Sequence, residues 1–203
     1  MNTYTFLFTS LIMILMPGMG VMYTISTGLT KGKEMSIFAA LGCSIGIFPH
    51  MMLSIMFSSL IAKMSNEAFF ILKLIGALYL LYIGAGMLIK TISLEIGKQI
   101  ENKSSDILFR GFFVNLLNPK LTLFFFSFFP QYVSFSSEDY AVKSLLYGVG
   151  FMVLTFIIFI GYGVLAGTAK QLIIGFPKRM SMIQKCFGLI FILFAIQLSL
   201  SSI

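Results

Sequence analysis

The chain is 203 residues long, with 58% hydrophobic and only 10% charged residues. Ordinary soluble domains have roughly 45–50% apolar and about 25% charged residues, so this composition excludes a soluble globular protein and indicates an integral membrane protein. The net charge of +7 comes from basic residues scattered between apolar segments, and it therefore does not indicate a nucleic-acid partner.

Six segments are long and apolar enough to be predicted as membrane-spanning helices, which need about 20 mostly apolar residues each. In chain order they occupy about residues 4–27, the interval between Glu34 and Lys63, and residues 68–89, 111–133, 143–170 and 185–203. The predicted fold is therefore an all-α, multi-pass membrane protein that forms a single polytopic domain over residues 1–203. The sixth segment is short and contains Gln197, which leaves a five-span arrangement open.

Basic residues are distributed unequally between the two sides of this predicted domain. Ten of the 14 Lys and Arg residues fall in the first, third and fifth loops or at their edges, and three fall on the opposite side. Because loops rich in Lys and Arg tend to stay in the cytoplasm, we assign the ten-residue side to the cytoplasm. With six spans, both termini then face outward.

The chain also divides into two halves of three predicted spans each. Three is an odd number, so a duplicated half inserts upside down relative to the first. Pro17 and Pro119 are 102 positions apart, and Gly46 and Gly148 have the same offset. We therefore predict two inverted three-helix repeats, at about 1–89 and 111–203, joined by a cytoplasmic linker at about 90–110.

Both prolines interrupt apolar segments, in the sequences PGMG at 17–20 and NPK at 118–120. Proline lacks an N–H and clashes with the carbonyl four residues earlier, so each break frees backbone groups that protein, water or ligand must satisfy. A single proline is commonly only a kink, whereas paired breaks in two halves of a transporter mark a substrate site. The predicted substrate-binding residues are Pro17, Gly18, Gly20, Asn118, Pro119 and Lys120.

Lys120 is the strongest functional candidate among these residues, because placing a cation at mid-membrane costs at least about 2.5–3.5 kcal/mol. It follows Arg110 by ten positions, which places it about 15 Å inward along a helix. All seven acidic residues lie in loops or at span ends. One explanation is structural: the ammonium group bonds Asn118 and freed carbonyls, or it snorkels to the interface. The other is functional: an anionic group of a substrate forms an ion pair with it. We favour the functional explanation.

His50 is the only histidine and lies in the second predicted span. A histidine on an apolar helix is commonly a hydrogen-bonded packing residue, but it is also the side chain that titrates near neutral pH, so proton handling is the alternative role. We expect Pro17, Lys120 and His50 to converge on one cavity. Cys43 and His50 could share a helix face, but two soft ligands do not make a metal site.

Several of these segments together resemble a known family. The fourth span carries GFFVNLLNPK at 111–120 and PQYV at 130–133, the third carries LKLIGALYLLYIG at 72–84, and Pro17-Gly18 and Gly46 with His50 stand in the first two. In these motifs the chain resembles the LysE/RhtB amino-acid exporters. The resemblance implies an exporter in the inner or plasma membrane that moves amino acids outward in exchange for protons. It implies no cofactor, and as partners only the amino acid, protons and the bilayer; it makes no prediction of oligomeric state.

Two positions depart from the family pattern. Met19 stands where a second proline is common, and Ile47 stands where an acidic or amide residue often follows the glycine. A buried cation without a nearby acid disfavours a second positive charge, so we predict that neutral amino acids are preferred over lysine or arginine. An exporter of a cation or metal is the alternative. An intramembrane enzyme would need a nucleophile–base pair or paired carboxylates, and we predict that the protein is not an enzyme.

Overall fold

A computed structural model gives the fold of the chain, and every element that it describes is a helix. The described residues are 3–57, 66–89, 103–129, Tyr132, 139–168 and scattered positions between 182 and 199. The all-α prediction is therefore confirmed over these residues. Most of the predicted linker and of the sixth span lies outside them.

The first predicted span consists of two helices, α1 (Thr3–Leu15) and α2 (Met19–Lys31), which are bent by 53° relative to each other. Pro17 lies between them because it cannot donate the N–H that would continue α1. At the other end of α2, Gly32 has a φ of 89°, a left-handed conformation that favours glycine. This turn leads directly into the next helix.

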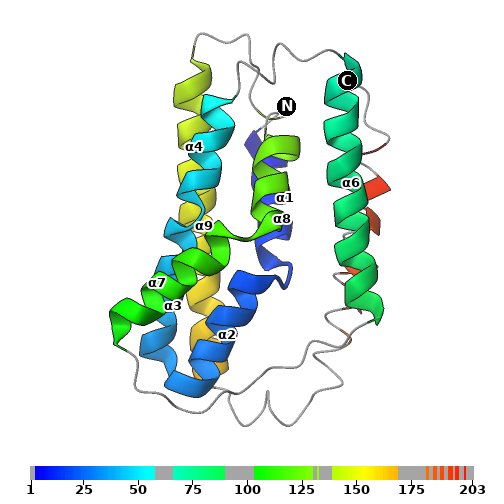
Figure 1. Ribbon diagram of the computed structural model, residues 1–203. Helices are drawn as coiled ribbons and strands as arrows, with labels where there is room; N and C mark the ends of the chain where they lie inside the picture. Colours follow the sequence, from blue (N-terminus) through cyan, green and yellow to red (C-terminus); the bar gives the residue numbers. More distant parts are fainter. Residues whose placement is uncertain are drawn as a thin grey trace.

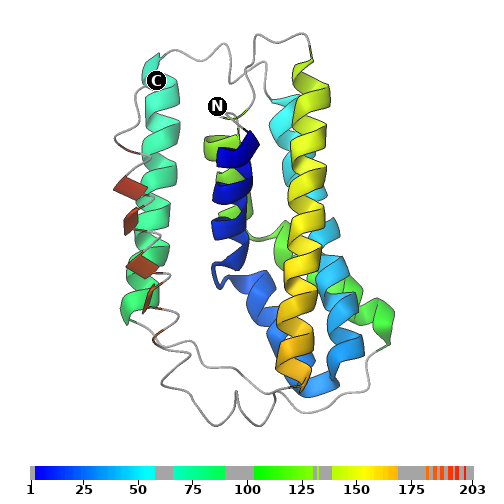
Figure 2. The same cartoon turned by 180° about the vertical axis from the view of Figure 1, so that it is seen from behind.

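The second predicted span consists of α3 (Lys33–Ile45) and α4 (Phe48–Met56). Together they form a continuous segment of 24 residues, Lys33–Met56, that is long and apolar enough to cross a membrane. Pro49 lies in the first turn of α4, where a helix tolerates a residue without an N–H. The third predicted span is a single helix, α6 (Asn66–Ile89), which stands to one side of the other helices in Figures 1 and 2.

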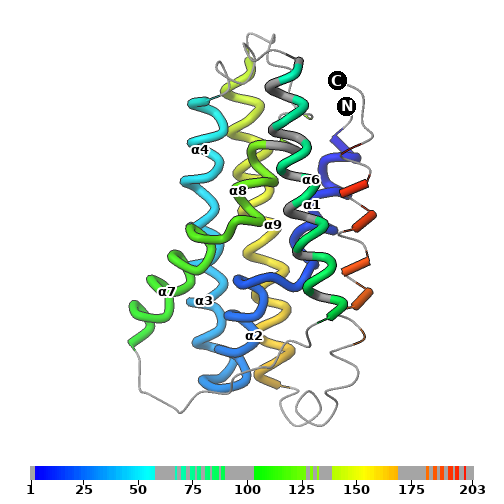
Figure 3. The backbone as a smooth tube through the Cα atoms, turned by 45° about the vertical axis from the view of Figure 1, so that its right-hand side comes forward, coloured from blue at the N-terminus to red at the C-terminus, as the bar shows by residue number. Residues whose placement is uncertain are grey.

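The fourth predicted span begins earlier than expected and is broken. α7 (Ser104–Leu116) starts inside the predicted linker and is followed by α8 (Pro119–Leu123) and the π-helix η1 (Phe124–Phe128). Figure 3 shows α7 running downward and outward beside α3, and α8 running upward from the break. The ten residues from Arg110 to Lys120 are thus not one straight helix, and the depth of 15 Å inferred along it does not apply.

α9 (Tyr140–Thr168) has 29 residues and is the second helix that could span a membrane by itself. Figure 2 shows it running along the bundle, where it packs against α1, α2, α3 and α4. Aromatic rings fill the space beside it, and the rings of Phe124 and Phe151 stack with centroids 4.7 Å apart. If the bent pair α1–α2 counts as one span, the described residues contain three candidate spans; six spans in inverted repeats remain a prediction.

Glycines allow the helices around the breaks to pack closely. A Cβ atom built on Gly42 of α3 would overlap the backbone carbonyl of Leu108 in α7, and one on Gly46 would lie 2.5 Å from the carbonyl oxygen of Phe112. Gly111 on α7 faces the Ala39 carbonyl in the same way, at 2.8 Å. Small residues at such contacts let two backbones approach within membranes. α7 is therefore held against α3, which positions the second break.

Candidate functional site

The break at Pro17 leaves the carbonyl of Met13 without its usual donor, because that donor would be the N–H of residue 17. Lys120 takes this place. Its Nζ donates to the Met13 carbonyl oxygen at 3.0 Å and to the Met16 carbonyl oxygen at 3.2 Å. The Tyr162 hydroxyl of α9 donates to the Leu15 carbonyl at 2.9 Å. Side chains from α8 and α9 thus satisfy the C-terminal carbonyls of α1.

The break at Pro119 is satisfied in the same manner. The carbonyl four residues earlier belongs to Asn115, and it lies 3.0 Å from Nε2 of His50. Because a carbonyl oxygen can only accept, the proton of this hydrogen bond is on Nε2. The other ring nitrogen, Nδ1, lies 3.2 Å from the hydroxyl oxygen of Thr122, which donates to it when the ring is neutral.

At each proline break, a side chain from the other half of the chain therefore donates a hydrogen bond to the freed carbonyl. Lys120, next to Pro119, bonds the carbonyl freed by Pro17, and His50 of the first half bonds the carbonyl freed by Pro119. Buried carbonyls need such partners, since an unsatisfied group costs about 1–3 kcal/mol. Lys120 thus connects the two breaks directly, whereas His50 connects α4 to the α7–α8 break.

Two asparagines shape the second break. The side-chain oxygen of Asn118 accepts from the backbone N–H of Lys120 at 3.1 Å and so caps α8. The Asn118 amide donates to Oδ1 of Asn115 at 3.3 Å, and the Asn115 amide donates to the Cys43 carbonyl at 2.8 Å. A Cβ atom on Gly20 would lie 2.5 Å from Oδ1 of Asn115. Only a glycine lets α2 approach the asparagine this closely.

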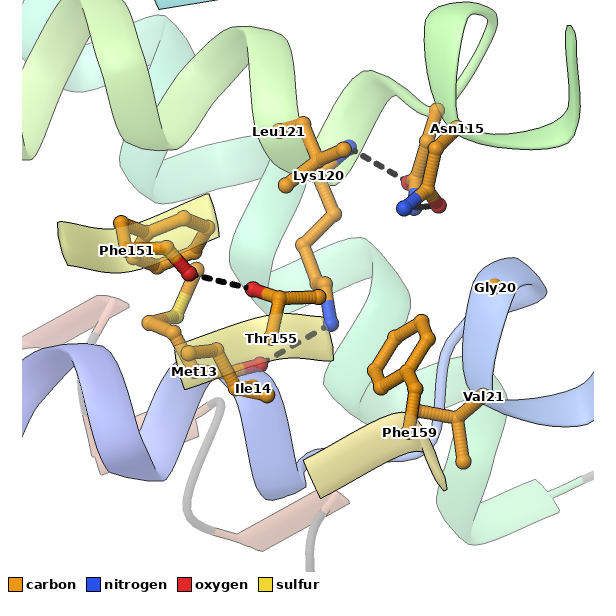
Figure 4. A pocket seen from close by; sticks show the side chains of 11 residues that line it. Met13, Ile14, Gly20, Val21, Asn115, Lys120, Leu121, Phe151, Thr155 and Phe159 are labelled. Carbon is orange, nitrogen blue, oxygen red and sulfur yellow. Dashed lines mark hydrogen bonds between the residues drawn. The ribbon is translucent and has the colours of Figure 1, made fainter. Parts of the chain in front are cut away.

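A small cavity lies where the two breaks meet, and Figure 4 shows Lys120 extending past it toward Met13. Its walls come from α1, α2, α9 and the α7–α8 break. The polar side chains in the lining are Asn115, Asn118, Lys120 and Thr155, and Phe151 and Phe159 supply much of the apolar wall. The volume open to a water-sized sphere is about 20 Å³, which is room for about one water molecule.

The predicted site residues fall into three groups by position. Gly20, Asn118 and Lys120 line the cavity. Gly18 lies beside Lys120, since a Cβ atom there would be 3.1 Å from Nζ, and the two prolines form the breaks without being part of the lining. His50 is also outside the lining and bonds the backbone of Asn115. Lys120 and His50 thus donate to the carbonyls four residues before Pro17 and Pro119, but Pro17, Lys120 and His50 do not line one cavity as expected.

Asn115, Thr155 and Tyr162 contribute to this region and were not predicted from the sequence. For Asn115 a signal exists, because it is the residue four positions before Pro119 and its carbonyl must lose its helical donor. Thr155 and Tyr162 lie on the long helix α9. Nothing in its apolar sequence distinguishes the face that meets α1.

The buried charge of Lys120 is the main electrostatic feature of the site. The residue is only 8% exposed, and both oxygens that its ammonium group reaches are neutral carbonyls. These carbonyls point from the C-terminal end of α1, where the helix dipole favours a cation. The ammonium group is therefore held by partial charges alone, and it can still pair with an anion.

An all-helical protein whose apolar helices can cross a membrane, with a cavity between two broken helices that is lined in part by polar side chains, has the architecture of a membrane transporter. The comparison with known families agrees. Residues 11–202 match the family model of LysE type translocators, and the chain belongs to that family. The protein is a transporter and not an enzyme.

Relatives of the chain include named efflux proteins. It is 30% identical to the homoserine/homoserine lactone efflux protein of Salmonella typhimurium over 94% of this chain and 92% of that protein. It is 27% identical to the leucine efflux protein of Klebsiella pneumoniae over 98% of this chain and 95% of the relative. An uncharacterized membrane protein of Vibrio cholerae is 31% identical over 92% and 90% of the two chains. No solved structure matches.

Proposed function

We propose that this protein exports amino acids from the cell, with neutral amino acids preferred, at the cavity between the two helix breaks. The observation that carries the proposal is the buried ammonium group of Lys120, whose two acceptors are neutral carbonyl oxygens. A carboxylate entering the cavity would be the first full negative charge bonded to it. Charge-assisted hydrogen bonds of this kind are about twice as strong as neutral ones.

The preference for neutral amino acids follows from the same charge. A lysine or arginine substrate would bring a second cation into a low-dielectric cavity beside Lys120, where repulsion is strong. Two of the relatives named above are efflux proteins, one for homoserine and homoserine lactone and the other for leucine. Homoserine and leucine are zwitterions without a cationic side chain, whereas the lactone has no carboxylate and lends the proposal no support. An export assay in which arginine outcompetes homoserine or leucine would contradict this part of the proposal.

Transport proceeds by alternating access in this proposal, with the broken helices as hinges. A cavity of about 20 Å³ holds a water molecule but not an amino acid, so the described conformation is a closed one. The chain has flexible points where opening is needed, at the 53° bend between α1 and α2 and at the α7–α8 break. In such folds, one bundle moves against the other around the site.

Proton antiport is the proposed source of energy, and His50 is the proposed proton carrier. It is buried, and it connects the freed carbonyl of Asn115 to the hydroxyl of Thr122. Protonating Nδ1 would turn it from an acceptor into a donor and so change its bond to Thr122. A proton could in this way alter the α7–α8 break next to Lys120. The proposed location is the inner or plasma membrane, with six spans.

Replacing Lys120 with Met tests the proposal, because it removes the charge but keeps a long apolar side chain. We expect Lys120→Met protein to insert at normal levels and to lose efflux, measured as growth protection against a panel of amino acids and toxic analogues. Lys143→Met is the matched control, since Lys143 is exposed and pairs with Asp139 at the start of α9. Unchanged efflux by Lys120→Met would mean that the ammonium group only fills a structural role.

A further inference from the structure

The C-terminal end of α1 already binds an ammonium group in the closed protein. The carbonyl oxygens of Met13 and Met16 lie 3.0 and 3.2 Å from Nζ of Lys120 and hold it between them. Backbone carbonyls only accept, and they do not distinguish the ammonium of a lysine from that of another molecule. Any primary ammonium group of the same position and direction could make both bonds.

The surroundings allow another ammonium group to replace that of Lys120 at these carbonyls. Lys120 reaches these oxygens from α8 on the far side of the cavity, and Met13 and Lys120 both line it (Figure 4). Gly18 keeps the space at the ammonium group free, because a Cβ atom there would lie 3.1 Å from Nζ. The side chain of Lys120 has a flexible stem of four carbons, so the ammonium group can leave the carbonyls by rotation about its bonds, without any change in α8.

We propose that the carbonyls of Met13 and Met16 form the subsite for the α-ammonium group of the substrate, which Lys120 occupies while the site is empty. This inference rests on the proposed export of amino acids. An entering zwitterion places its ammonium group on the two carbonyls and its carboxylate on the displaced Lys120. Every group that loses a partner in this exchange gains one of equal or greater charge.

The exchange also explains how binding would reach the hinges. While Lys120 bonds Met13 and Met16, it ties α8 to the end of α1 across 107 and 104 residues of sequence. A bound zwitterion removes this direct tie and replaces it with a bridge through the substrate. A carboxylate without an amino group would leave the Met13 and Met16 carbonyls without a donor. An amine without a carboxylate would leave the displaced Lys120 without a partner. The site therefore selects molecules that carry both groups.

The carbonyl subsite can be tested without transport. Lys120→Ala empties it, and we expect propylammonium to raise the melting temperature of the purified variant by about 2–4 °C. Propionate, which has the wrong charge, and tetramethylammonium, which has no N–H donors, should have no effect. Wild-type protein and the control Gly150→Ala, a site with open space around it, should not respond to propylammonium. Equal responses to tetramethylammonium, or none to any cation, would overturn the subsite.

A second measurement uses wild-type protein and so does not depend on the folding of Lys120→Ala. Three compounds with the same isobutyl side chain make this comparison. Leucine carries both the ammonium and the carboxylate group, 3-methylbutylamine carries only the ammonium group, and 2-hydroxy-4-methylpentanoate carries only the carboxylate. We expect each single-group compound to bind at least about tenfold more weakly than leucine, because hydrogen bonds to charged groups are lost. Equal binding of the hydroxy acid and leucine would refute the subsite and leave amino-acid export intact.

The two measurements separate the inference from the proposed function. If propylammonium stabilises Lys120→Ala but wild-type protein neither binds nor exports any amino acid, the carbonyls are an ammonium site and the export proposal fails. If amino acids are exported but propylammonium has no effect and the hydroxy acid competes fully, the export proposal stands and the subsite fails.

Discussion

The chemistry of two prolines accounts for the positions of both buried basic side chains. Each proline removes the N–H that would bond the carbonyl four residues earlier, at Met13 and at Asn115. A basic side chain donates to each of these carbonyls, and the Asn115 carbonyl also accepts from the Asn118 N–H at 3.0 Å. Lys120 and His50 are therefore structural partners of the breaks in the closed state. Their proposed roles in transport require that these same bonds break and re-form.

Substitutions at His50 separate its structural role from proton handling. His50→Gln places an amide N–H near the position of Nε2 and keeps a donor for the Asn115 carbonyl, but it cannot titrate near neutral pH. His50→Leu removes the donor as well. If His50 carries the proton, we expect His50→Gln to keep the melting temperature of the wild type and to lose efflux driven by a pH gradient.

His50→Leu should be less stable than His50→Gln by about 0.5–1.5 kcal/mol, because the Asn115 carbonyl loses one of its two donors and keeps only the Asn118 N–H. The readouts are thermal unfolding in detergent and counterflow in vesicles with and without a pH gradient. Full pH-driven efflux by His50→Gln would assign to His50 the structural role alone.

At the scale of helices, function depends on two breaks that are held in different ways. The first is a bend between α1 and α2, where the side chains of Lys120 and Tyr162 donate to the Met13 and Leu15 carbonyls at the end of α1. The second is fixed more firmly, because α7 packs on α3 through glycines and Asn118 caps α8. We expect the α1–α2 break to move more than the α7–α8 break during transport.

Pro17→Ala tests the first hinge. An alanine supplies an N–H that can bond the Met13 carbonyl and compete with Lys120, and it favours a straighter helix. The expected result is slower efflux with equal or higher thermal stability. Pro49→Ala is the control, since Pro49 lies in the first turn of α4 and its missing N–H matters little there. Faster efflux by Pro17→Ala would show that the bend is not a required hinge.

Gly42→Ala tests the contact between α3 and α7. Its added Cβ atom would overlap the backbone carbonyl of Leu108, so the helices must separate, which is expected to destabilise the protein by about 1–3 kcal/mol. Gly150→Ala on α9 has open space around its Cβ and serves as the matched control. Thermal unfolding of the two variants measures the difference, and equal melting temperatures would contradict the packing described.

At the scale of the whole molecule, the chain direction agrees with the sidedness predicted from basic residues. Figures 1 and 2 place the α2–α3 turn, the start of α7 and the end of α9 at one end of the bundle. The starts of α1 and α9 lie at the opposite end. Helix ends that border the loops assigned to one side of the membrane thus lie at the same end of the bundle. In the proposed orientation, export would run from the end with Gly32 to the end with Asp139.

Labelling of single cysteines tests this orientation. In a background with Cys186→Ser, which removes the exposed cysteine, Glu34→Cys should react with an impermeant maleimide only from the cytoplasmic side. Asp139→Cys should react only from outside. The remaining Cys43 is buried and should stay unlabelled. Labelling of Glu34→Cys in intact cells would reverse the assignment.

Much of this architecture could be predicted from local features. Runs of apolar residues between charges predicted where helices α3–α4, α6 and α9 lie, and the prolines predicted both breaks. Helix α7 starts at Ser104, before the predicted fourth span at 111–133, and it contacts Gly42 of α3 through the Leu108 carbonyl, a tertiary contact that no local pattern indicates. The inverted six-span repeat is a prediction that the described residues do not test.

The sequence by itself determined which segments are apolar, where their helices break and which two carbonyls lose their donors, because each of these depends on residues within one turn. The tertiary structure alone decided which side chains replace those donors. Lys120 and Met13 are 107 positions apart, and His50 and Asn115 are 65 apart. Hydrogen bonds at such separations depend on how helices pack, and packing decided that Lys120 at the second break and His50 of α4 donate to these carbonyls.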